Sequence, residues 1–282
     1  MPKRATLMLA SAGAASALLI LTWFLAFHVG FLERADARIL GGFADLRRPR
    51  VDPLASFIAQ LCNPQPYVYF AGALVGLALA RGRPRVALAI GVVLFGANAT
   101  TQLLKPLLAE PRYVLPGETP IGAASWPSGH ATAAMSLALC SVPAVPARLR
   151  PAVATLGAAF AVAVSYSFLT LGWHYPSDVF GGFLVAAAWT LLGVGTLFAL
   201  DARHPRGVGT GPAPVRFPAR TALGPPAAAL LGTVALAGLV ALVRPEPVVV
   251  YAQVHTTFVV GAAAIGALGL ALATGLMLAL RR

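Results

Sequence analysis

Nearly all the reactive polar side chains of this apolar chain lie in one stretch, between residues 105 and 178. The stretch opens with Lys105 and Arg112, contains His130, and closes with His174 and Asp178. Ammonium and guanidinium groups bind anions, and imidazoles transfer protons near neutral pH. A carboxylate four residues after a histidine can orient the imidazole ring. These residue types together indicate chemistry on an anion.

The composition places the chain in a lipid bilayer. Of its 282 residues, 58% are hydrophobic and 11% are charged, whereas soluble domains have about a quarter charged residues. The net charge of +12 would suit a nucleic-acid partner, but the cations form short clusters between apolar runs. We therefore interpret the cations as signals of membrane topology and expect no nucleic-acid partner.

The two cysteines, Cys62 and Cys140, each stand alone, one in a loop and one in an apolar run. This spacing indicates neither a disulfide framework nor a metal site. No other metal-ligand cluster is evident in the sequence, so we expect the protein to work without a metal or another cofactor.

Eight apolar runs are candidates for membrane spans, which need about 20 residues each. They cover about residues 5–32, 66–80, 86–104, 131–145, 151–171, 178–200, 221–243 and 256–280. We predict an all-α, polytopic membrane helix bundle, with a six-helix core and two extra C-terminal transmembrane helices. The first run is too long for the core of a cleavable signal peptide, which favours a retained anchor.

The pattern predicts three parts: a core over residues 1–200, a linker rich in Gly, Pro and Arg over 201–220, and a membrane extension over 221–282. Within the core, the charged segment 33–65 could hold a short amphipathic surface helix, and we interpret its charges as a solvated face. The small-residue run 261–269 suits close helix packing and is compatible with a homodimer.

The positions of Lys and Arg predict the topology. If the N-terminus is cytoplasmic, most of the cations outside segment 33–65 fall on the cytoplasmic side. Both termini then lie in the cytoplasm, and loops 105–130 and 172–178 lie on the outer face. Because one helix hairpin separates these two loops, they can meet. We expect a multi-pass protein of the cell membrane with an outward-facing site.

Three motifs, in this order, resemble those of the type 2 phosphatidic acid phosphatase superfamily. The first is Lys105 followed by Arg112, and the second is Ser-Trp-Pro-Ser-Gly-His at 125–130. The third begins at Ser167 and includes Gly-Trp-His-Tyr-Pro-Ser-Asp-Val at 172–179. One motif alone would be weak, but the three at this spacing are specific. The superfamily includes membrane lipid phosphatases, small acid phosphatases and vanadium haloperoxidases.

This resemblance implies a catalytic role for three residues. His174 would attack phosphorus, Asp178 would hold the other ring nitrogen of His174 protonated, and His130 would protonate the leaving oxygen. A phosphohistidine would form and be hydrolysed by water. The substrate would be a lipid phosphate or diphosphate, such as a polyprenyl diphosphate or phosphatidate.

The resemblance also implies four phosphate-binding residues: Lys105, Arg112, Ser128 and Gly129. Their chemistry agrees with this role, because phosphoryl transfer depends mainly on positioning and on neutralising charge. Arginine offers a two-pronged fork and lysine a point charge. Ser128 and Gly129 precede an apolar run, and the free N–H groups of a helix start bind anions.

Phe168 departs from the third motif, which usually has an arginine six residues before its histidine. One phosphate ligand is therefore missing, and this leaves two alternatives to a lipid phosphatase. The chain could be a lipid-phosphate binding or transport protein with weak turnover. A haloperoxidase would share the pocket but would need vanadate and is expected to be soluble.

Each motif alone also has a structural interpretation. Residues 127–130 could simply start a helix, and Lys105 and Arg112 could lie at the membrane interface with their charged ends in water. His174 and Asp178 could be a structural pair on one helix face. The joint spacing of the motifs, on one predicted side of the membrane, favours the functional interpretation.

Overall fold

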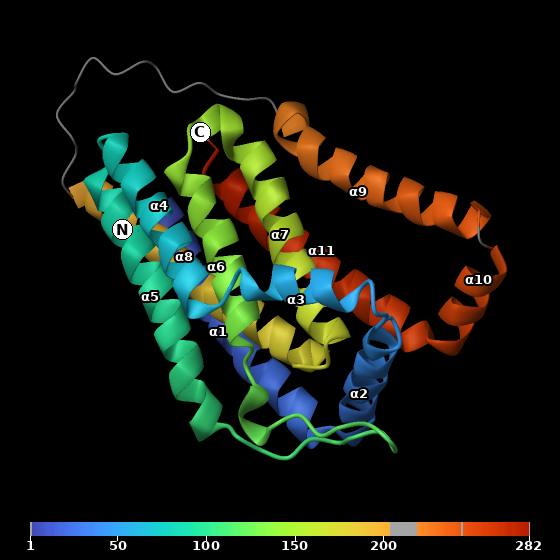
Figure 1. Ribbon diagram of the computed structural model, residues 1–282. Coiled ribbons are helices and arrows are strands. Elements are labelled where there is room, and N and C mark those ends of the chain that lie inside the picture. The colour runs from blue at the N-terminus through green and yellow to red at the C-terminus, as the bar shows by residue number, and fades with distance from the viewer. Residues whose placement is uncertain (1, 204–218, 244, 282) are drawn as a thin grey trace.

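The computed structural model describes residues 2–203, 219–243 and 245–281 (Figure 1). Over these residues the regular structure is helical, as the sequence predicts. The helices are α1 (Lys3–His28), α2 (Gly30–Ala44), α3 (Asp52–Gln60), α4 (Pro64–Ala80), α5 (Pro84–Leu107), α6 (Gly129–Ala144), α7 (Arg150–Thr170), α8 (Pro176–Arg203), α9 (Ala219–Val243), α10 (Pro245–Val254) and α11 (Thr256–Ala279), with 3-10 turns at Ala123–Ser125 and Ala147–Leu149. Most of the predicted linker 201–220 lies outside the described residues.

Among the described residues, six helices are long and apolar enough to cross a membrane: α1, α5, α7, α8, α9 and α11. The two other predicted spans correspond to α4, with 17 residues, and α6, with 16 residues. Almost every residue of α6 is buried. A helix that is covered by its neighbours does not face lipid, so it need not match the full thickness of the bilayer. The chain is a multi-pass membrane protein with an all-α fold.

Segment 33–65 contains two helices, α2 and α3, rather than one. Helix α2 is amphipathic, with Ala37 and Phe43 buried and Arg34 and Arg38 exposed. The interpretation of the segment as a solvated face is correct for these arginines. It is wrong for Asp36, which lies on the buried face and is only 7% exposed.

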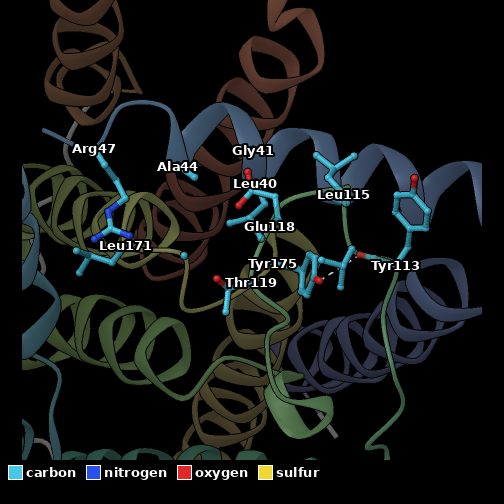
Figure 2. A pocket seen from close by; sticks show the side chains of 13 residues that line it. Leu40, Gly41, Ala44, Arg47, Tyr113, Leu115, Glu118, Thr119, Leu171 and Tyr175 are labelled. Atoms are coloured by element: carbon cyan, nitrogen blue, oxygen red, sulfur yellow. Dashed lines mark hydrogen bonds between the residues drawn. The ribbon is translucent and has the colours of Figure 1, made fainter.

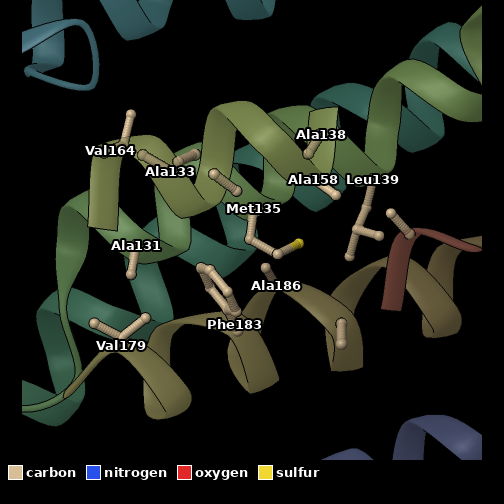
Figure 3. Packing of buried hydrophobic residues seen from close by; sticks show 14 of the residues in the cluster. Ala131, Ala133, Met135, Ala138, Leu139, Ala158, Val164, Val179, Phe183 and Ala186 are labelled. Atoms are coloured by element: carbon tan, nitrogen blue, oxygen red, sulfur yellow. The ribbon is translucent and has the colours of Figure 1, made fainter. Parts of the chain in front are cut away.

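The core lies where α8 packs against α1 and α6, and α6 in turn packs against α7 (Figure 3). Met135 of α6 and Phe183 of α8 are both fully buried and fill the space between their helices. They are surrounded by alanines, including Ala131, Ala138 and Ala186. Small side chains allow helices to approach closely, which is the main source of packing energy between helices in a membrane.

The starts of α6 and α8 are in direct contact because residue 182 is a glycine. A Cβ atom on Gly182 would lie 2.8 Å from the backbone oxygen of Ser128 and 2.9 Å from the backbone nitrogen of Thr132. At the same place the Ser128 N–H donates a 3.0 Å hydrogen bond to the backbone oxygen of Asp178. Two motifs that are 50 positions apart in the chain are therefore held together by backbone contacts.

Polar contacts inside the bundle join α4, α5 and α6. The Asn98 amide donates to the Tyr67 hydroxyl at 2.6 Å, and the hydroxyl groups of Thr101 and Thr132 are 3.0 Å apart. Buried polar groups need partners where water is absent. These bonds fix α5, which carries Lys105, relative to α6.

The C-terminal helix α11 belongs to the packed bundle, whereas α9 is largely exposed. Cβ atoms on Gly261 and Gly269 would lie 2.6 Å from Ile39 and 3.0 Å from Val162. The small-residue run 261–269 therefore packs against α2 and α7 of the same chain. The interpretation of this run as a dimer face loses its support, because these close contacts are made within one chain.

The close contact at Gly182 gives a testable prediction. Changing Gly182→Ala forces a methyl group against backbone atoms that cannot rotate away, so we expect the free energy of unfolding to fall by about 1–3 kcal/mol. Thermal unfolding of the purified protein in detergent measures this. The matched control is Gly72→Ala, where nothing lies within 4 Å of the added Cβ. Equal stability of the two variants would contradict the argument.

Candidate active site

The predicted site residues come together at one end of the bundle. Each is carried by the end of a helix or by an adjoining loop: Lys105 by the last turn of α5, Arg112 by loop 108–122, Ser128, Gly129 and His130 by the start of α6, His174 by the α7–α8 loop, and Asp178 by the first turn of α8. In Figure 1, loop 108–122 lies beside the start of α2. The Tyr175 hydroxyl donates a 3.2 Å hydrogen bond to the backbone oxygen of Tyr113, so the two loops that the topology predicts to meet are neighbours.

His174 and Asp178 form a buried pair. The Nδ1 atom of His174 lies 3.1 Å from Asp178 Oδ2, which also accepts a 3.0 Å hydrogen bond from the Tyr175 N–H. Asp178 is fully buried, and its place in the first turn of α8 is favourable for a negative charge. Because Nδ1 faces the carboxylate, Nε2 of His174 is the ring nitrogen left to attack an electrophile.

His130 faces this pair from the start of α6. The ring centroids of His130 and His174 are 6.5 Å apart. Nε2 of His130 lies 3.0 Å from Oδ1 of Asn63, the residue that precedes α4. This contact orients the His130 ring. Asn63 did not stand out in the sequence, because no motif places it near His130.

Phe168 occupies the space beside both imidazoles. It is fully buried, and its ring centroid lies 5.2 Å from that of His174 and 6.0 Å from that of His130. The ring centroid of Trp173 lies 5.8 Å from that of His130, and Trp173 is more exposed than Phe168. The position where the family motif has an arginine thus contributes an apolar wall and no charge.

The start of α6 has the geometry of an anion site. The Ser128 hydroxyl caps the helix by accepting a 3.3 Å hydrogen bond from the Ala131 N–H. The backbone N–H of Ser128 is already bonded to Asp178. The remaining N–H groups of the first turn, those of Gly129 and His130, have no partner inside the helix and can bind an anion.

Lys105 is a predicted phosphate ligand whose ammonium group remains available to bind an anion. It is half-buried in the last turn of α5 and close enough to His130 and Asp178 to interact with them electrostatically. Within the described part of the chain, no carboxylate lies at ion-pair distance from its ammonium group. The ammonium group can therefore bind an incoming anion.

Arg112, in contrast, is bonded to two carboxylates of the protein. Its Nη1 donates to Asp178 Oδ1 at 3.2 Å, and its Nη2 donates to Asp36 and, at 2.9 Å, to the Ser177 hydroxyl. The guanidinium lies between the rings of Phe27 and Tyr175, at 4.3 and 4.4 Å from their centroids. Its side chain is 1% exposed, and Nε is buried without a partner. Both prongs of the predicted phosphate fork are thus occupied by carboxylates.

Asp36 is a second site residue, after Asn63, that the sequence did not predict. Its carboxylate accepts hydrogen bonds from the backbone N–H and the hydroxyl of Ser177, at 2.9 and 2.6 Å, as well as from Arg112. Burial raises the pKa of Asp36 from 3.8 to about 6, and the charge of Arg112 opposes that rise. A signal was present, because Asp36 shares a helix face with Leu32 and Phe43. A carboxylate on an apolar stripe indicates a buried partner.

A cavity of about 110 Å³ lies between α2 and the loop that follows Arg112 (Figure 2). Its lining includes Leu40, Arg47, Tyr113, Glu118 and Tyr175. The Tyr175 hydroxyl donates a 3.2 Å hydrogen bond to the backbone oxygen of Tyr113, which Figure 2 shows as a dashed line. The cavity therefore adjoins the ring on which Arg112 stacks.

The arrangement can perform nucleophilic substitution on an anion. One imidazole is oriented by a carboxylate, a second imidazole faces it, and a helix start and an ammonium group are close by. In the described ranges, no three His, Cys, Asp or Glu side chains are grouped so that they could hold a metal ion.

Comparison with known proteins gives two matches. Residues 86–201 match the family model described as the PAP2 superfamily. The structure is similar to the crystal structure of the first transmembrane PAP2 type phosphatidylglycerolphosphate phosphatase from Bacillus subtilis, with a TM-score of 0.55. The two are 20% identical, and the match covers 69% of this chain and 98% of that chain. In a search of curated proteins, no sequence matches.

The position of Arg112 predicts a large effect on stability. Changing Arg112→Met leaves the carboxylates of Asp36 and Asp178 buried without their cation, so we expect the free energy of unfolding to fall by about 3–5 kcal/mol. Thermal unfolding measures the change. Arg34→Met, on the exposed face of α2, is the matched control. A loss no greater than that of the control would mean that Arg112 does not compensate the two carboxylates.

Proposed function

We propose that the chain hydrolyses a lipid phosphate through a phosphohistidine intermediate, because residues 86–201 match the family model described as the PAP2 superfamily. The family match and the structural neighbour support a membrane phosphatase in general. The observation that carries the mechanism is the His174–Asp178 pair facing His130 at the start of α6.

His174 is the proposed nucleophile. Its Nε2 lone pair attacks phosphorus and the bond to the leaving oxygen breaks, while His130 gives that oxygen a proton. Asp178 holds Nδ1–H and stabilises the cationic ring that forms. In the second step His130 takes a proton from water, and the resulting hydroxide releases phosphate from His174. Both steps use only groups that the site contains.

We propose that Lys105 and the first-turn N–H groups at Gly129 bind the phosphate oxygens, with Ser128 holding the helix start in place. Arg112 already donates to the carboxylates of Asp178 and Asp36. The substrate is proposed to be a phosphomonoester or diphosphate of a lipid, because the site lies at the end of a membrane-spanning bundle. The candidate substrates are polyprenyl diphosphate, phosphatidate, phosphatidylglycerol phosphate and a glycolipid precursor, and the structural neighbour is named for phosphatidylglycerol phosphate. We propose that the site faces outward and that both termini are cytoplasmic.

A second candidate function is a lipid-phosphate binding or transport protein with weak turnover. The observation in its favour is Phe168, which leaves one side of the two imidazoles without a cation. Such a protein would bind a lipid phosphate and release little phosphate.

Loss of the nucleophile tests the mechanism. We expect His174→Ala to lower phosphate release by at least about a thousandfold, because no other group can form the covalent intermediate. The assay uses the purified protein in detergent with phosphatidate, phosphatidylglycerol phosphate and polyprenyl diphosphate as substrates. His255→Ala, which removes a histidine paired with exposed Asp45, is the control. Release by both variants would refute the mechanism, and binding without release by wild type would favour the second function.

Replacing Phe168→Arg tests the missing cation. A guanidinium beside both imidazoles would add a charged hydrogen bond to the phosphate, so we expect KM to fall about tenfold. We also expect a lower Tm, because Phe168 is fully buried and its packing is lost. Phe168→Met is the matched control, since it alters the packing without adding charge. If the two variants have the same KM, the charge at position 168 does not govern substrate binding.

A further inference from the structure

Asp36 belongs to α2, outside residues 86–201, and yet its carboxylate bonds to Arg112 and Ser177, next to the His174–Asp178 pair. In Figure 1, α2 lies beside the loop that joins α5 and α6. The catalytic mechanism above assigns no task to Asp36. A buried carboxylate is costly unless it is paired, so its place in the site requires an explanation.

Every oxygen of this carboxylate is used. Oδ1 accepts the Ser177 backbone N–H, and Oδ2 accepts both the Ser177 hydroxyl and Nη2 of Arg112. The backbone N–H of Ser177 is one of the free donors at the start of α8. Asp36 therefore binds the first turn of α8 at the residue that immediately precedes Asp178.

Two routes lead from Asp36 to His174. In the first, Arg112 bridges Asp36 and Asp178, and Asp178 holds Nδ1 of His174. In the second, Asp36 fixes Ser177, and through it the backbone that carries Asp178. Because each contact is a hydrogen bond between buried groups, a shift of Asp36 moves the carboxylate that orients the nucleophile.

Arg112 takes part in this cluster through both Nη1 and Nη2. Its edges are held by two carboxylates and its faces by Phe27 and Tyr175. No N–H of the guanidinium is both free and exposed, since Nε is buried. Arg112 is thus arranged to support Asp178.

We propose that Asp36 is a positioning residue of this active site, which acts with Arg112 to hold Asp178 and thereby fixes the imidazole of His174 for attack. This inference rests on the proposed function. It makes α2 a working part of the site, and it assigns Arg112 to the support of the catalytic pair. A competing role predicts the opposite effect of removing the Asp36 charge. If Asp36 only blocked Arg112 from a substrate phosphate, loss of that charge would improve substrate binding.

The protonation of Asp36 provides a readout that a merely structural role would not change. The groups that face Asp36 or act on its surroundings are Arg112 from loop 108–122, Tyr175, Ser177 and Asp178 around the start of α8, and Glu33 on α2 itself. Because burial raises its pKa to about 6, Asp36 loses its charge as pH falls through about 6. The neutral carboxyl holds Arg112 less firmly, so activity declines on the acid side.

The test compares the full-length wild type with Asp36→Asn in detergent between pH 5 and pH 8.5. At pH 8 we expect kcat to fall about 10- to 100-fold with KM within about twofold, since a small misplacement of catalytic groups has this effect. At pH 5 the wild type is itself protonated at Asp36, and the two rates should converge to within about threefold. Asp45→Asn, at the exposed C-terminal end of α2, is the matched control and should follow the wild type.

Two outcomes would overturn the proposal. A lower KM with unchanged or higher kcat would mean that Asp36 competes with the substrate. A loss of rate that is equal at every pH and parallels a loss of folded protein would mean that its role is structural only.

A second measurement does not depend on turnover and so separates this proposal from the proposed function. In protein with ¹⁵N-labelled histidine, the Nδ1–H proton of His174 should give a downfield NMR signal, assigned by its absence in His174→Ala. We expect the signal to shift or broaden in Asp36→Asn but not in Asp45→Asn. An unchanged signal in Asp36→Asn would overturn the proposal even if the wild type releases no phosphate.

Discussion

The site depends on the compensation of one fully buried carboxylate. Asp178 has no contact with solvent, and it is stabilised by a guanidinium, an imidazole, a backbone N–H and the start of a helix. Each of these partners comes from a place defined by the bundle. Loop 108–122 has to return across the end of the bundle to deliver Arg112. The α7–α8 loop has to turn sharply at Gly172, whose φ of 73° suits glycine, to deliver His174.

The bundle can hold these groups because its central helices approach so closely. Helices α6 and α8 meet through alanines and glycines, and their first turns share a backbone hydrogen bond. Without a hydrophobic drive between helices inside lipid, such tight contact is what fixes their positions. The rigid contact then holds the α6 start, with its free N–H groups, beside the His174–Asp178 pair.

The sequence predicted the helical membrane fold and the meeting of the two motif-bearing loops. These features follow from the lengths of the apolar runs and from the local spacing of residues, both of which can be read directly from the amino-acid sequence. It could not predict that Asn63 contacts His130 or that Asp36 contacts Arg112, because these contacts join segments far apart in the chain. The charged neighbours of Asp36 also led to the wrong interpretation. Arg34 and Arg38 are solvated, whereas Asp36, on the same helix, faces the core. The packing of Gly261 against Ile39 depends on how α11 docks, which no local pattern reveals.

The contacts that support the catalytic groups extend well beyond the segment that matches the family. Phe27, in the last turn of α1, stacks on Arg112, and Asn63 contacts His130. Helix α1 also packs along α8. The boundary of sequence similarity is therefore not the boundary of the working unit. A fragment of residues 86–201 would keep all three motifs and lose the helices that position them. A design that moves the three motifs into another protein would therefore also need the N-terminal helices.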